Sequence, residues 1–318
     1  GNVNVTNLME SGSDTFDIAF NGANNRIGEG NITNSGVLSF NSGNTTFVTG
    51  LSHTGCGTTA INNNAALTAT VGNISLGATV LNGSIAATDG NLTTASLDAT
   101  GTADHLTANG AMSTGAITIA SGDTLTLTGG TITTDTITGN SSSSDLVLNA
   151  TGTETIGGMV SVHNVTIAQS GGTTFNGNLA VNGSLSTANG SFDVTLSGAN
   201  NTIAGNTTFT NTGNVSLGGN TTFASGVTHT VGDTIVTGNT SVTARDVILG
   251  ATVLNGTITT ADGNVTTYSL NATGTADQVN ALGMFGTIST GNVTIASGDT
   301  LTLTGGTITT DTITGNSS

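Results

Sequence analysis

The string TIASGDTLTLTGGTITTDTITGNSS occupies residues 118–142, and the same string returns letter for letter at residues 294–318. Two such segments in a single globular core would diverge, because each would adapt to different neighbours. Their identity therefore indicates equivalent surroundings, as in a protein built from stacked repeats.

Apolar side chains alternate with threonine inside this string, and Gly-Gly, Thr-Asp and Gly-Asn pairs interrupt the alternation. Successive side chains of a β-strand face opposite sides, so the pattern predicts three short strands joined by corners. Strands this short are unstable alone, but they become stable when strands of neighbouring coils cover them on both sides. We therefore predict an all-β fold, a right-handed parallel β-solenoid (β-helix) with about 18–22 residues per coil. The residues expected inside it are Leu125, Leu127, Ile132 and Ile137, with their copies Leu301, Leu303, Ile308 and Ile313.

The repetition extends beyond this string. GATVLNG occurs at 77–83 and at 250–256, and FDIAFNGANN at 16–25 returns as FDVTLSGANN at 192–201. Three residues are inserted in the segment GTADQVNALGMFG that starts at Gly274. The chain thus reads as tandem units of about 176 residues, a partial unit at 1–142 and a complete unit at 143–318 of one continuous solenoid. We expect the array to continue beyond both ends.

Composition supports an ordered β structure. Only 6% of the residues are charged, 35% are hydrophobic, 48 of 318 are Gly, and there is no Pro. Disordered chains are usually rich in Pro and charge, and the lack of Pro leaves every backbone N–H available for strand pairing. Gly-Asn pairs open many expected strands, where both residues tolerate left-handed backbone and stacked asparagines can hydrogen-bond between coils.

The net charge of −16, with only two Lys or Arg residues, excludes several partners. Binding to a phosphate backbone needs several cationic side chains, so nucleic acid and anionic membrane surfaces are not expected partners. No apolar run reaches the roughly 18 residues of a membrane span, so membrane insertion is not expected. Cys56 is the only cysteine, aligns with Gly232 of the second unit, and is expected to be an inert or buried thiol.

Catalysis has little support, and no catalytic residue is assigned. A β-helix enzyme acting on polysaccharide would need clustered carboxylates. The nearest pair in sequence is Asp14 and Asp17, of which only Asp17 has a counterpart, Asp193. Since stacking could join distant residues, an enzyme acting on polysaccharides stays open as a weaker alternative.

No metal or cofactor site is assigned either. Asp89, Asp262, Asp123 and Asp299 lie at expected corners, without a calcium-binding pattern, and should cap turn backbone. The four histidines, without an HExxH pattern, are expected to be solvated or to lie on strand faces; they are His53, His105, His163 and His229.

Aromatic residues are too few to suggest carbohydrate binding by ring stacking, since there are nine Phe, one Tyr and no Trp. The phenylalanines that recur between units are expected to stack in the core; they are Phe16 with Phe192 and Phe47 with Phe223.

Coils built on GNVTI, GNLTT, GDTLTLTGGTIT and GNVSLGGN, without Pro and almost without Cys or Lys, resemble filamentous haemagglutinin-like adhesins and autotransporter passengers of bacteria. The resemblance covers essentially the whole chain but concerns the style of the repeat. It implies a non-enzymatic stalk or fibre displayed outside the cell, on the bacterial surface. Its expected partners are further copies of the repeat, covalent or head-to-tail, with host surfaces, neighbouring cells or glycans bound through other parts of the protein.

Ice binding is the main alternative function. A flat array of threonines on a regular solenoid can match an ice lattice, and TLTLT and TITTDTIT suggest such an array. VSVHNVTIAQS and HTVGDTIVTGN do not keep this pattern, although a flat array would need it on every coil. Measurable thermal hysteresis would favour ice binding over the stalk.

Overall fold

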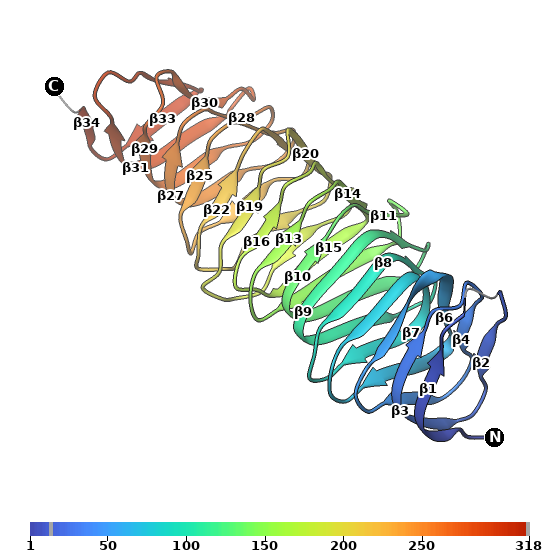
Figure 1. The fold of residues 1–318 in the computed structure, drawn as a ribbon. Helices are drawn as coiled ribbons and strands as arrows, with labels where there is room; N and C mark the ends of the chain where they lie inside the picture. The colour runs from blue at the N-terminus through green and yellow to red at the C-terminus, as the bar shows by residue number, and fades with distance from the viewer. Residues whose placement is uncertain (13–14, 316–318) are drawn as a thin grey trace. The chain divides into compact units, whose positions relative to one another are not determined.

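The computed structural model describes residues 1–12 and 15–315 and contains no helix among them. The chain divides into two compact units, Gly1–Gly158 (unit 1) and Met159–Ser318 (unit 2). Within each unit the chain winds as a right-handed parallel β-solenoid, whose successive coils are stacked (Figure 1). The predicted fold class is therefore confirmed, whereas the repeat boundary at 142/143 stays a prediction from sequence.

The strands of unit 1 are β1 (Asn4–Glu10), β2 (Ile18–Phe20), β3 (Asn24–Ile32), β4 (Leu38–Phe40), β5 (Asn44–Phe47), β6 (Leu51–Ala69), β7 (Ile74–Ala87), β8 (Leu92–Ala99), β9 (Asp104–Ile119), β10 (Thr124–Thr134), β11 (Ile137–Gly139), β12 (Asp145–Ala150) and β13 (Glu154–Ile156).

The strands of unit 2 are β14 (Val160–Val162), β15 (Asn164–Gln169), β16 (Thr173–Phe175), β17 (Leu179–Val181), β18 (Leu185–Thr187), β19 (Val194–Leu196), β20 (Asn200–Ile203), β21 (Thr207–Thr208), β22 (Val215–Leu217), β23 (Asn220–Phe223), β24 (Val227–His229), β25 (Thr234–Val236), β26 (Asn239–Val242), β27 (Val247–Leu254), β28 (Thr257–Thr260), β29 (Val265–Ala272), β30 (Asp277–Ala281), β31 (Thr287–Ile295), β32 (Leu301–Thr304), β33 (Thr307–Thr310) and β34 (Ile313–Gly315).

Paired residues give the length of each coil. Leu51 pairs with Ile74 and Ile74 pairs with Leu92, so two successive coils of unit 1 advance by 23 and 18 residues. In unit 2, Asp277 pairs with Leu301, an advance of 24 residues. The predicted 18–22 residues hold for most coils. The longest ones exceed this range, and the coil from Asp277 contains the three-residue insertion.

The core lies between the strands of each coil, where alternate side chains point inward. Leu127 of β10 pairs with Leu106 of β9 on one side and with Leu148 of β12 on the other, and all three are fully buried. The other predicted core residues of this string, Leu125, Ile132 and Ile137, are also buried. Thr126, Thr128, Thr131 and Thr133 face outward, as the alternation predicted, whereas Thr134 at the corner is buried.

The second copy of the string is not buried as predicted. Leu301 and Leu303 are only partly buried, and Ile308 and Ile313 are 43% and 58% exposed. Their strands pair with β30 and β31, and no other strand in the described part of the chain covers their opposite side. Identical residues therefore differ in burial because the first copy has neighbouring coils on both sides and the second on one.

Asparagine side chains form ladders between coils, as expected. In unit 2, Asn220 Nδ2 donates to Asn200 Oδ1 (3.2 Å), and Asn239 Nδ2 donates to Asn220 Oδ1 (3.0 Å). The glycines of the Gly-Asn pairs mostly serve a different purpose from the one expected. Gly72 has a positive φ of 91°, but Gly90 does not. A Cβ at Gly90 would lie 2.0 Å from the carbonyl oxygen of Gly72, so close stacking of coils excludes a side chain there.

Recurring phenylalanines follow the prediction with one exception. Phe47 and Phe223 are fully buried and Phe192 is nearly so. Phe16 is 45% exposed, which contradicts the expectation that it packs in the core. The phenylalanines that do stack in this part of unit 1 are Phe20 and Phe40, whose ring centroids lie 5.3 Å apart.

Candidate functional site

The acidic residues that the structure describes are spread along the solenoid. Within the described ranges, no group of three or more His, Cys, Asp or Glu side chains lies close enough to hold a metal ion. Asp14 lies outside the described residues. Asp17 Oδ1 accepts a hydrogen bond from Val37 N–H (2.8 Å), and Asp193 Oδ1 accepts one from Asn214 N–H (2.7 Å). These equivalent aspartates therefore cap the backbone of a neighbouring coil.

His53 and His229 lie on strands β6 and β24, as one expected alternative had it, but their side chains are fully buried and not solvated. The Nδ1 atom of His53 lies 2.8 Å from Thr59 Oγ1, and that of His229 lies 3.0 Å from Thr234 Oγ1. Burial lowers the pKa of both imidazoles, because it penalises the charged form. Both rings are therefore neutral core residues at neutral pH.

Asp104 bridges two neighbouring coils of unit 1 through its carboxylate. Gly83 N–H donates to Oδ1 (2.7 Å), and Gly101 N–H donates to Oδ2 (2.9 Å). Asp277 repeats this arrangement in unit 2, with Gly256 and Gly274 as donors at 2.8 Å each. Sequence reasoning missed this pair of caps, although both lie in the recurring GTAD motif.

The predicted corner caps Asp89, Asp262 and Asp299 are exposed or half-buried, and among the described residues no side-chain hydrogen bond to turn backbone supports their predicted role. Asp123 differs from them in its burial. It is fully buried, and neither carboxyl oxygen has a hydrogen-bond partner of good geometry in the described structure. Burial, and then the negative charge of Asp104, raise the pKa of Asp123 from 3.8 to about 7. This carboxyl is thus about half protonated at neutral pH, next to a carboxylate that is held by backbone donors.

Cys56 is exposed, which rules out the buried alternative for its thiol, whereas an inert thiol stays a prediction. Its alignment with Gly232 is wrong. A Cβ at Gly57 or at Gly232 would lie 3.0 Å from Nε2 of a buried histidine, His53 or His229 respectively. Gly57 is therefore the counterpart of Gly232. Unit 1 therefore has one additional residue in the irregular stretch of β6 that contains Cys56, between His53 and Thr58, where the strand register shifts.

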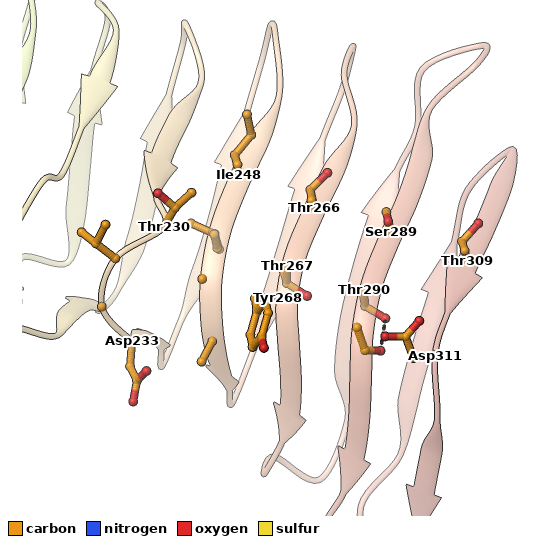
Figure 2. Close-up of a pocket in the computed structure, with 16 residues that line it drawn as sticks. Thr230, Asp233, Ile248, Thr266, Thr267, Tyr268, Ser289, Thr290, Thr309 and Asp311 are labelled. Carbon is orange, nitrogen blue, oxygen red and sulfur yellow. Dashed lines mark hydrogen bonds between the residues drawn. The ribbon is translucent and has the colours of Figure 1, made fainter. Parts of the chain in front are cut away.

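A groove with a volume of about 570 Å³ crosses neighbouring coils of unit 2. It begins beside β24 and continues over β27, β29, β31 and β33, and Figure 2 shows the side chains that line it. We call it the β27–β33 groove. Its lining is Thr230, Val231, Gly232, Asp233, Ile248, Leu249, Gly250, Ala251, Thr266, Thr267, Tyr268, Ser289, Thr290, Gly291, Thr309 and Asp311.

Three apolar side chains in this groove are open to solvent. Tyr268, the only tyrosine of the chain, is 81% exposed, Val231 is 54% exposed and Ile248 is 36% exposed. Single exposed apolar residues are normal on protein surfaces, but here three of them lie on adjacent coils of one hollow. Glycines line parts of the groove, because a Cβ at Gly291 would lie 2.0 Å from the Tyr268 carbonyl oxygen.

A row of side chains along one wall is fixed by strand register. Ile248 pairs with Thr266, Thr266 with Ser289, and Ser289 with Thr309. Three neighbouring coils therefore each present one hydroxyl at the same position, at a spacing of about 4.8 Å. Two carboxylates, Asp233 and Asp311, also line the groove.

The repeat pattern of the sequence does not predict this groove. The clearest signal in the sequence was the replacement of Ala95 by Tyr268 within otherwise similar segments, ASLDATGTAD and YSLNATGTAD. The number of aromatic residues gave no such signal, because composition does not show whether a single tyrosine lies in a groove where it could bind a ligand.

Elsewhere, the outward threonines of β10 are continued unevenly on the neighbouring coils, since Thr133 pairs with Ser113 of β9 and with Thr155 of β13. Thr126 pairs with His105 of β9 and with Val147 of β12. No helix in the described ranges has the length and apolar character needed to cross a membrane.

Comparison of the chain with known proteins finds no matching family model, no matching curated protein and no matching solved structure. The resemblance to haemagglutinin-like adhesins therefore rests on the style of the sequence repeats.

Proposed function

We propose that this chain is a segment of a structural stalk or fibre on the outside of a bacterial cell, where it supports adhesion. The observation that carries the proposal is the stacking of coils in each unit, whose cores bury against the next coil in sequence. Such an architecture adds length with each repeat. The haemagglutinin-like style of the repeat supports the extracellular location.

Further copies of the repeat are the proposed partners. The string at 124–134 is covered by β12 and β13, where Leu125 pairs with Leu146 and Ile132 with Glu154. The identical string at 300–310 leaves Ile308 43% exposed. A coil of the same kind as 145–156 therefore has the shape and register to cover it, whether it belongs to the same polypeptide or to a second copy.

Electron microscopy of the native protein tests this proposal. We expect thin rods in which each sequence repeat of about 176 residues adds about 40 Å, since each coil adds about one strand spacing of 4.8 Å. The native chain mass separates a long covalent array from head-to-tail assembly of short chains. Compact particles at all concentrations would contradict the proposal, and so would freezing-point hysteresis, which would indicate ice binding.

A further inference from the structure

We propose that the β27–β33 groove binds a strand of neutral polysaccharide. The groove combines an exposed aromatic ring, a row of hydroxyl groups and two carboxylates in one hollow of about 570 Å³. Ligand sites usually combine apolar surface with a few polar groups that fix orientation. A sugar ring matches this combination, because it has an apolar C–H face and a rim of hydroxyl groups.

Tyr268 supplies the platform for such a ring. Its side chain is 81% exposed on β29, and Figure 2 shows it between the strands that carry Ile248 and Thr290. Aromatic rings contribute much binding energy when they are covered, and the phenol oxygen can form a hydrogen bond at the same time. Ile248 and Val231 extend the apolar surface across the neighbouring coils.

The polar groups favour an extended chain of sugars. Thr266, Ser289 and Thr309 repeat at about 4.8 Å along the groove, a spacing close to the length of one sugar residue in an extended polysaccharide. Each hydroxyl can both donate and accept a hydrogen bond, as a sugar hydroxyl can. The carboxylates of Asp233 and Asp311 accept hydrogen bonds from sugar hydroxyls without needing a charged partner.

The negative charge of the groove favours a neutral ligand. No Lys, Arg or His is found among the described residues that line the groove, which instead contains Asp233 and Asp311. The whole chain carries a formal charge of −16. Uronic acid polymers and sulfated or phosphorylated glycans would therefore be repelled.

Unit 1 offers a natural comparison. Four positions differ: Asp233, Ile248 and Tyr268 correspond to Thr58, Ser75 and Ala95, and Val231 lies where unit 1 has Gly55 and Cys56. The other lining residues are identical in the corresponding segments, for example Gly77 for Gly250 and Asp135 for Asp311. The solenoid needs none of the four larger or charged side chains, because unit 1 forms the same coils without them. Because the fold does not require these four side chains, their presence together in the β27–β33 groove indicates that they bind a ligand.

Tyrosine fluorescence gives a direct test. The chain has one Tyr and no Trp, so its emission reports on Tyr268 alone. We expect saturable changes in emission on titration with at least one of a soluble β-glucan, a galactomannan and a xylan, and no change with alginate or polygalacturonate. Failure of all three neutral polymers, or equal binding of the acidic ones, would overturn the proposal.

Variants locate the binding. Affinity electrophoresis should show at least a tenfold loss of affinity for Tyr268→Ala and for the four-residue change Val231→Gly, Asp233→Thr, Ile248→Ser and Tyr268→Ala. Phe285→Ala is the matched control, because Phe285 is 83% exposed but lies outside the groove. Equal loss in this control would overturn the assignment. Rod formation does not depend on these residues. Loss of polysaccharide binding and loss of rods in electron micrographs are therefore separate outcomes, which test the groove and the stalk proposal independently.

Discussion

Replacing Ile132 by Ala is expected to lower the free energy of unfolding by about 2–5 kcal/mol, the usual cost of emptying a tightly packed site. The same replacement at Ile308 should cost about 1 kcal/mol or less, because that side chain is 43% exposed and Ile132 only 1%. The two residues occupy identical strings. Urea unfolding followed by circular dichroism, on dilute monomeric protein, measures both changes.

Ile132 and Ile308 have the same neighbours in sequence. The effect of alanine on strand propensity is therefore the same at both sites and cancels when the two losses of unfolding free energy are compared. Equal losses in the monomer would contradict the different burial of the two copies. At higher concentration, the loss at Ile308 should grow toward that at Ile132 if further copies stack on β33. A cost at Ile308 that is independent of concentration, while fibres form, would place their contact elsewhere.

Asp123→Asn is expected to stabilise the protein at pH 8 by roughly 2–4 kcal/mol. The folded-state pKa of Asp123 is about 7, against an ordinary value of 3.8. Each pKa unit corresponds to about 1.4 kcal/mol, and the upper part of the range assumes that the full shift counts. The substituted amide cannot ionise, and it can donate to the carboxylate of Asp104.

The pH dependence has a definite sign. A carboxyl whose folded pKa is raised binds more protons in the folded state, so its contribution favours folding below about pH 4 and is lost as the pH rises to about 7. The stability difference between Asp123→Asn and wild type should therefore be near zero at pH 4, grow up to pH 7 and then level off. The buried histidines titrate in both proteins, so their opposite trend cancels in this difference.

Asp299→Asn is the matched control for the titration. Asp299 lies in the same SGDTLTLT segment but is only half-buried, so its replacement should change stability much less at pH 8. Chemical unfolding at pH 4, 6, 7 and 8 measures all three proteins. A difference between Asp123→Asn and wild type that does not vary with pH would contradict the raised pKa.

The sequence by itself determined the architecture. Alternation of Leu or Ile with Thr fixes which side chains of β10 face inward, and the lack of Pro leaves the backbone free to pair. The repeat offset also identified Asp17 and Asp193 as equivalent residues, and in the structure both accept a backbone hydrogen bond from a neighbouring coil. These features are local or periodic, so they can be read from the order of residues alone.

Only the tertiary structure decided how each copy is surrounded. Asp123 and Asp299 share one local sequence, yet only Asp123 is sealed beside a second carboxyl. Tyr268 stands in a groove because strand register places Ile248, Ser289 and Thr309 around it, up to 41 residues away in sequence. Burial, pKa and hollows depend on the coils above and below a residue, and the residue's own segment does not contain that information.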